Sequence, residues 1–149
     1  MTYTELKQKH QEEINRFPLG FAFSDTQFEE MMRNWELDAK NPEDLKKRIS
    51  IGAGGFIQKK DLPAFKEILI RHKEEKAALL KRESDLIEAL VYELHNHEYG
   101  YSRDSADMEA AIGALGLSWA DVDAEKHPFT HKCLIQAERR CIKEFNENN

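Results

Sequence analysis

One run of glycines interrupts a chain whose other segments are mostly patterned as helices. Three of the seven glycines fall within the four residues 52–55. Two isoleucines lie just before this run, and Phe56 and Ile57 follow it. Glycine adopts backbone angles that other residues avoid, and β-branched or aromatic residues on both sides favour strands. The pattern therefore predicts a short β-hairpin around residues 49–58.

Helix-start signals and apolar periodicity divide the rest of the chain into about six to seven helices. Thr2 and Glu5 form one capping box, and Ser24 with Gln27 forms a second. Asn41 and Pro42 supply a cap and a first-turn proline for a further helix. The expected helices span approximately 3–17, 24–37, 42–48, 61 to a break near 84, 84–100, and 130–145. The helix over 84–100 carries the apolar stripe of a central core helix. The segment 107–122 is expected to form a helical corner in which Ser118 and Asp121 cap the second arm. The predicted fold is mainly α.

Length and composition fit one globular domain. The chain has 149 residues, of which 40% are apolar and 34% are charged. A domain of this size buries about 70% of the surface that its unfolded chain exposes. We expect a compact single domain over residues 1–149, with residues 146–149 frayed at its end.

Charge is distributed unevenly along the sequence, although the net charge is only −6. Residues 40–60 contain six basic and two acidic side chains, whereas residues 84–125 contain ten acidic side chains and one basic one. One interpretation is that both stretches are solvated helix faces. The other is that the acidic stretch docks on a basic groove of another protein.

The glycine run also raises the possibility of a phosphate site. Successive amide groups of a loop can cradle an anion, and Lys59 and Lys60 follow closely. However, no lysine followed by serine or threonine completes a Walker pattern, and Asp61 would repel an anion. We expect no cofactor, and we keep binding of a nucleotide or small ligand by the glycines and lysines, with His72, as the alternative function.

Neither a metal site nor a catalytic constellation is expected. His95 and His97 are two residues apart, so on one helix they point in different directions. His97 is better explained as a hydrogen-bonding residue at a helix end. No nucleophile motif is present, and the acidic corner 118–125 argues against duplex DNA binding. We therefore expect a protein that is not an enzyme.

The cysteines and the N-terminus indicate an intracellular protein. Cys133 and Cys141 are eight residues apart in one predicted helix, about 12 Å along its axis, which is too far for a disulfide between them. The first residues contain no apolar signal region, and no apolar run approaches the roughly 18 residues of a membrane span. The expected location is the cytoplasm, without membrane association.

Five segments spread over nearly the whole chain carry a resemblance to known sequences: Leu19–Glu30, Ile51–Asp61, Arg71–Glu74, Tyr92–Tyr101 and Ala114–Leu117. Together they resemble a family of small uncharacterised proteins of phages and prophages in gut Firmicutes. The resemblance implies the context of a mobile element in a bacterial host. Accessory proteins of that kind are often binders that block host defence, including anti-CRISPR proteins.

The sequence-based expectation is thus a non-enzymatic protein that binds and inhibits a host protein, such as a nucleic-acid-processing defence effector. Homodimerisation is left open. The residues expected to bind a ligand or partner are Gly52, Gly54, Gly55, Lys59, Lys60, His72, His97 and Tyr99.

Overall fold

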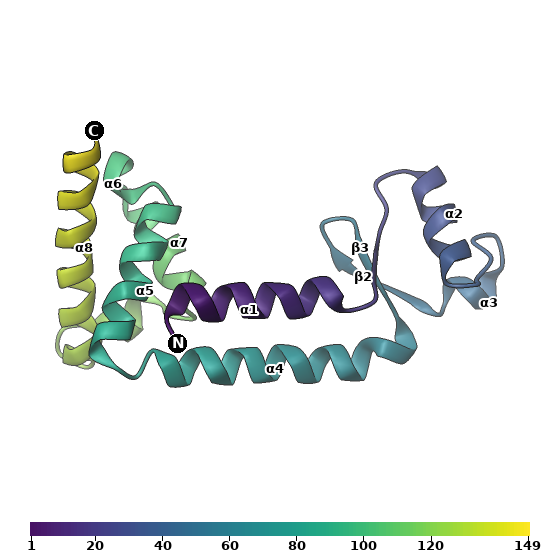
Figure 1. Ribbon diagram of the computed structural model, residues 1–149, viewed down its shortest axis with the longest axis horizontal. Coiled ribbons are helices and arrows are strands. Elements are labelled where there is room, and N and C mark those ends of the chain that lie inside the picture. The colour runs from purple at the N-terminus through teal and green to yellow at the C-terminus, as the bar shows by residue number, and fades with distance from the viewer. The chain divides into compact units, whose positions relative to one another are not determined.

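The computed structural model describes residues 1–149 as eight α-helices and one three-stranded antiparallel sheet (Figure 1). The chain divides into two units, which we describe separately. The helical unit comprises Met1–Lys7 and Glu74–Asn149, and the sheet unit comprises Gln8–Lys73. The elements are α1 (Tyr3–Arg16), β1 (Leu19–Phe21), α2 (Asp25–Asn34), α3 (Pro42–Leu45), β2 (Arg48–Gly52), β3 (Gly55–Gln58), the 3-10 helix η1 (Lys59–Asp61), α4 (Leu62–Leu79), α5 (Glu83–Asn96), α6 (Tyr99–Ser102), α7 (Ser105–Ala114), the 3-10 helix η2 (Trp119–Val122) and α8 (Pro128–Asn148).

The predicted fold class is confirmed. The chain is mainly helical, and β2 and β3 form the expected hairpin. The strand β1 was not anticipated, because three residues are too few for alternation to be recognised. None of the helices combines the length and the apolar character that a membrane crossing requires.

In the helical unit, α5 is the central core helix, as its apolar stripe predicts. It packs against α7 and α8, and α6 packs against α8 (Figure 1). The largest fully buried apolar side chains of this core are Leu90, Leu94, Ile112, Cys133 and Cys141. Side chains spaced three and four apart on α5 place one face of the helix inside this cluster.

Three boundaries in the helical unit differ from expectation. The helix predicted to reach residue 100 ends at Asn96, because Glu98 adopts a left-handed conformation with φ of 59° and α6 starts anew. The predicted cap formed by Ser118 and Asp121 is present, but the element that it caps is a single 3-10 turn. At the C-terminus, α8 continues to Asn148 rather than ending at Phe145.

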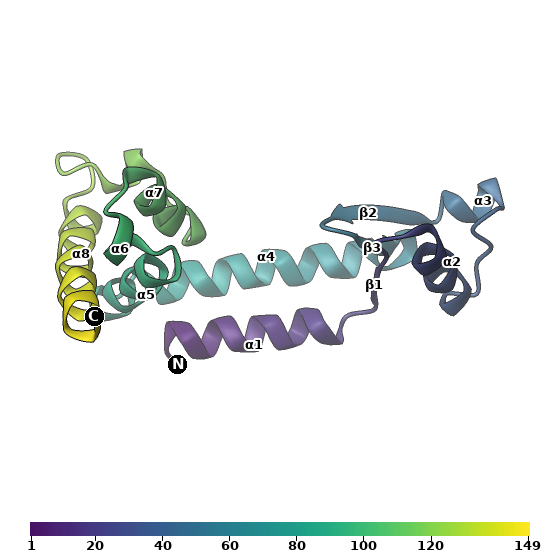
Figure 2. The same ribbon diagram turned by 90° about the horizontal axis from the view of Figure 1, so that it is seen from above.

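In the sheet unit, the strand order is β1-β3-β2 (Figure 2). Ile57 in the central strand is fully buried, opposite Leu19 on one side and Ile49 on the other. The helix predicted at 42–48 has only one turn, because the chain enters β2 at Arg48. Pro42 and the cap at Asn41 start α3 as expected.

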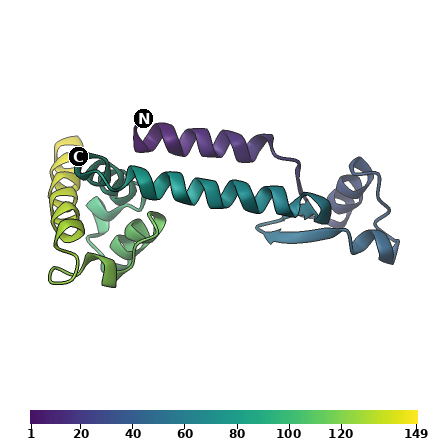
Figure 3. The same cartoon turned by 90° about the horizontal axis from the view of Figure 1, so that it is seen from below.

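The parts of α1 and α4 that belong to the sheet unit lie side by side and run antiparallel (Figure 3). His10 of α1 stacks on His72, and Phe17, the residue just after α1, packs on Phe65. The contact that lies later in the sequence on the α1 side is made by the residue that lies earlier in α4. The two helices therefore run antiparallel.

Candidate functional site

Exposed apolar side chains gather around the β-hairpin of the sheet unit. Phe21 is 59% exposed, Phe23 is 75% exposed and Ile51 is 39% exposed. We call these three side chains the sheet patch. Single exposed apolar residues are ordinary on protein surfaces, so the patch has meaning only if its members adjoin one another.

Gly54 and Gly55 of the hairpin bring the sheet patch together. Phe21 lies directly opposite Gly55, and a Cβ atom on Gly55 would lie 3.0 Å from Cγ1 of Ile51. A Cβ atom on Gly54 would lie 2.3 Å from the ring of Phe23. Both glycines are therefore covered by patch side chains, and any larger residue would displace them.

Strand β1 forms one edge of the sheet, and only those of its backbone N–H and C=O groups that face β3 form hydrogen bonds within the sheet. The amide of Ala22 donates a hydrogen bond to the carbonyl of Gly54 at 2.9 Å, which identifies this residue as one that faces β3. Backbone groups of successive residues in an antiparallel pair face opposite edges. Gly20 therefore faces β3 as well, and the N–H and C=O groups of Phe21 and the C=O of Leu19 face away from the sheet.

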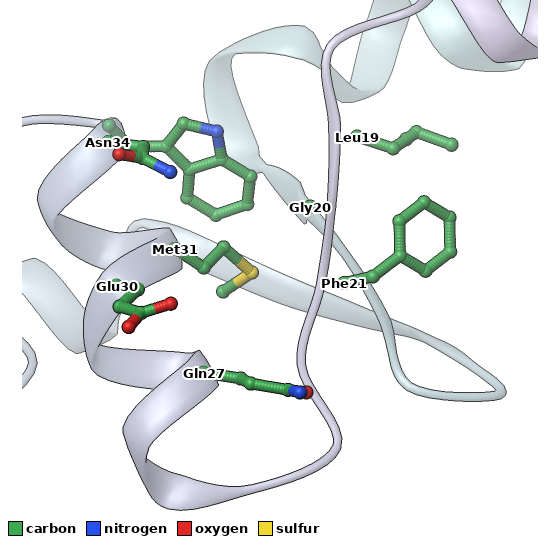
Figure 4. Close-up of a pocket in the computed structure, with 8 residues that line it drawn as sticks. Leu19, Gly20, Phe21, Gln27, Glu30, Met31 and Asn34 are labelled. Carbon is green, nitrogen blue, oxygen red and sulfur yellow. The ribbon is translucent and has the colours of Figure 1, made fainter.

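A pocket of about 320 Å³ lies between β1 and α2. In Figure 4, Gln27, Glu30 and Met31 extend from α2 towards β1, whereas Leu19 and Phe21 point away from that helix. The pocket is lined by Leu19, Gly20, Phe21, Gln27, Glu30, Met31, Asn34 and Trp35.

The close approach of β1 to α2 depends on Gly20. A Cβ atom at this position would lie 2.5 Å from Sδ of Met31 and 2.7 Å from the indole ring of Trp35. At the start of α2, the Ser24 side chain accepts a hydrogen bond from the backbone N–H of Gln27. The side-chain oxygen of Gln27 in turn accepts a hydrogen bond from the backbone N–H of Phe23 at 2.8 Å, so the side chains of Ser24 and Gln27 both fix the start of α2.

The pocket is electrostatically one-sided. Glu30 is the only ionisable residue that lines it. Its carboxylate takes part in no ion pair or side-chain hydrogen bond within the structure, and the same holds for the amide of Asn34. Glu30 and Asn34 are exposed to solvent, Met31 is buried and Trp35 is half-buried. An exposed carboxylate beside the half-buried indole of Trp35 suits a cationic side chain with a long aliphatic stem.

The structure does not bring the predicted phosphate-binding residues together. Gly52, Gly54 and Gly55 form the hairpin turn, whereas Lys59 and Lys60 lie in η1 beyond the far end of β3. Lys59 follows Gly55 by four positions along an extended strand, which corresponds to about 13 Å.

His72, the remaining member of that set, lies on the buried side of α4. Its ring stacks on His10, with ring centroids 3.7 Å apart and an angle of 12° between the planes. Burial lowers the pKa of His72, and the neighbouring charge of His10 lowers it further. Hydrogen bonds from Arg71 and contacts with His72 lower the pKa of Glu13 to about 2.

His97 and Tyr99 both make internal contacts in the helical unit. His97 lies at the C-terminal end of α5, with its Nε2 3.5 Å from Oε2 of Glu93. Tyr99 is buried, and its hydroxyl donates to Glu138 at 2.7 Å. Burial and this hydrogen bond raise the pKa of Tyr99 to about 12.

Sequence reasoning missed the fully buried carboxylate of Glu93. Its Oε1 atom accepts hydrogen bonds from the Tyr3 hydroxyl and from Lys7, both at 2.8 Å. Burial alone would raise the pKa of Glu93, but the contacts with Lys7 and Tyr3 outweigh it, and the pKa is lowered. A signal was available, because Glu93 is three residues after Leu90 and seven after Leu86 on the apolar stripe.

In the helical unit, a thiol, an imidazole and a carboxylate from three different residues also contact one another in a row. Sγ of Cys141 is 3.7 Å from Nδ1 of His95, whose Nε2 is 2.8 Å from Oε2 of Glu144. Cys141 is fully buried, and burial raises the pKa of its thiol. A nucleophilic cysteine needs a lowered pKa and access to substrate, so this arrangement is that of a structural core contact. Nor is any group of three or more His, Cys, Asp or Glu side chains arranged to hold a metal ion.

Comparison with known proteins places the chain in a family. The family model DUF7659, a family of unknown function, matches residues 2–132, and the chain belongs to this family. No curated protein and no solved structure is significantly similar to it.

Proposed function

We propose that this member of DUF7659 is a non-enzymatic binding protein that holds a partner protein through the sheet patch. The supporting observation is that Phe21, Phe23 and Ile51 are exposed around Gly54 and Gly55, beside an unpaired strand edge. Aromatic side chains near the centre of an interface contribute much of its binding energy. The glycines expected to form a binding site thus contribute by supporting these side chains.

The narrower form of this proposal is that the partner is a host defence effector in the bacterial cytoplasm and that binding inhibits it. This form rests on the sequence resemblance to phage and prophage proteins. The sheet patch and its neighbouring strand edge support protein binding in general.

Crosslinking from the patch tests the binding proposal. A photo-crosslinking amino acid at position 23 should capture a discrete partner in an extract of bacterial cells, and Phe21→Ser should weaken capture at least tenfold. The matched control is Ile70→Ser, which removes another exposed apolar side chain of the sheet unit, on α4 (58% exposed). Equal capture by Phe21→Ser and Ile70→Ser would contradict the assignment of the interface to the sheet patch.

A further inference from the structure

We propose that the free edge of β1 binds an extended segment of the partner as a fourth strand, with an arginine or lysine side chain opposite Gly20 reaching into the pocket beside α2. This inference rests on the proposed protein-binding function. It adds the backbone geometry of the contact and the chemistry of the bound segment.

The edge provides the backbone groups that strand addition requires. The N–H and C=O of Phe21 face outward, and the C=O of Leu19 is a second outward acceptor next to them. Unpaired groups of this kind pair readily with an extended chain, which gains main-chain hydrogen bonds along the edge.

The alternation of side chains sets the pattern of the incoming strand. A residue opposite Gly20 points towards α2, because a Cβ atom on Gly20 would point at Met31 and Trp35 on that face. Its two neighbours lie opposite Leu19 and Phe21 and point to the other face, where apolar side chains would extend the sheet patch. The expected segment is apolar, cationic, apolar.

The pocket fits the cationic residue. The aliphatic stem of the side chain would lie against the half-buried indole of Trp35, and its charged end would reach the exposed carboxylate of Glu30 and the side-chain oxygen of Asn34. An arginine guanidinium can donate two parallel hydrogen bonds to one carboxylate, so arginine is favoured over lysine.

A second copy of this chain is a poorer occupant of the same edge. Pairing of β1 with its own copy about Gly20 would place a glycine opposite Gly20. The pocket would stay unfilled, and the carboxylate of Glu30 would remain unpaired. Charge complementarity therefore selects a basic partner segment over self-association.

Fluorescein-labelled nine-residue peptides with a central Val-Xaa-Val test the proposal, with arginine, lysine, leucine or glutamate at Xaa. Anisotropy titrations should show binding at least tenfold tighter for arginine than for leucine, and the weakest binding for glutamate. Glu30→Gln should remove the preference for arginine over leucine. Glu29→Gln, on the same helix but outside the pocket, should preserve it.

Backbone methylation of the peptide tests the register. In a fourth strand that runs antiparallel to β1, N-methylation of the residue opposite Phe21 removes a hydrogen bond to β1 and should weaken binding at least tenfold. N-methylation of the central residue places the methyl group on the outer edge and should have little effect.

Three outcomes would overturn the inference. These are equal affinity for the arginine and leucine peptides, absence of binding by all four, and a concentration-dependent dimer in sedimentation that Phe21→Pro abolishes. If Phe21→Ser still weakens capture of the partner in any of these cases, the binding proposal survives without strand addition. If crosslinking at position 23 also fails, the proposed function fails with it.

Discussion

At the scale of single residues, side chains that the helical pattern leaves unexplained make specific internal contacts. Glu93 is charged but fully buried, and it is matched by Tyr3 and Lys7 from the start of the chain. A buried charge of this kind is stable only while its hydrogen-bond partners remain. The network therefore ties the first turn of α1 to α5 within the helical unit.

Tyr3→Phe tests this network. It removes a hydrogen bond to a buried carboxylate and should lower the free energy of unfolding by about 1.5–3 kcal/mol, as measured by urea denaturation. Tyr101→Phe is the control, because Tyr101 is 79% exposed, and its effect should stay within about 0.5 kcal/mol. If Tyr3→Phe left the free energy of unfolding unchanged, solvent would have to supply the hydrogen bond to Glu93 in the absence of the hydroxyl.

At the scale of elements, the candidate site depends on how β1 and α2 approach each other. Three short features combine there: a glycine in β1, a capped start of α2 and the ring of Trp35 at its end. The cap could be recognised from local sequence, since its hydrogen bonds join residues three or four apart. The close approach of β1 to α2 could not be recognised from local sequence. Gly20 meets Met31 and Trp35 only because the chain reverses between β1 and α2.

Gly20→Ala should destabilise the sheet unit by about 1–3 kcal/mol, because the added methyl group overlaps Met31 and Trp35. Gly113→Ala is the opposite case, since its Cβ atom would enter open space on α7. That variant should stabilise the protein by about 0.5–1 kcal/mol. Thermal unfolding of both variants measures the contrast, and a stabilising Gly20→Ala would show that β1 can move away from α2.

The cap of α2 gives a second prediction for this element. Ser24→Ala removes the acceptor for the Gln27 amide and should cost about 1 kcal/mol of stability. Ser24→Gly should cost only a few tenths of a kcal/mol, because glycine at a cap leaves the amide open to water. Equal losses for the two variants, in denaturant titrations followed by circular dichroism, would argue against a capping role.

At the scale of the whole molecule, the two units should respond differently to acid. The pKa of His72 in the sheet unit is lowered from its usual 6.5, first by burial. A lowered histidine pKa means that the folded state favours the neutral ring, so this contribution is complete above about pH 6.5 and is lost as pH falls below it. In the helical unit, Glu93 has a lowered pKa, so its contribution persists until pH falls below the usual carboxyl range near 4.5.

Amide hydrogen exchange measured between pH 7 and 5 tests this difference. After correction for the intrinsic pH dependence of exchange, amides of α4 around His72 should lose protection before amides of α5. His72→Phe keeps an aromatic ring against His10, but the new side chain cannot take up a proton. In this variant, lowering the pH from 7 to 5 should therefore cause a smaller loss of amide protection in the sheet unit. An unchanged pH dependence in this variant would assign the effect to another group.

The sequence by itself determined the helices, their caps and the hairpin, because these depend on periodicity and on hydrogen bonds between near neighbours. Ser24, Asn41 and Ser118 are caps in the structure as predicted, and the glycine run forms the turn between β2 and β3. Only the tertiary structure decided that β1 joins this hairpin and that Tyr3 and Lys7 meet the buried carboxylate of Glu93. Those features depend on pairings between residues distant in the chain, which local propensity does not specify.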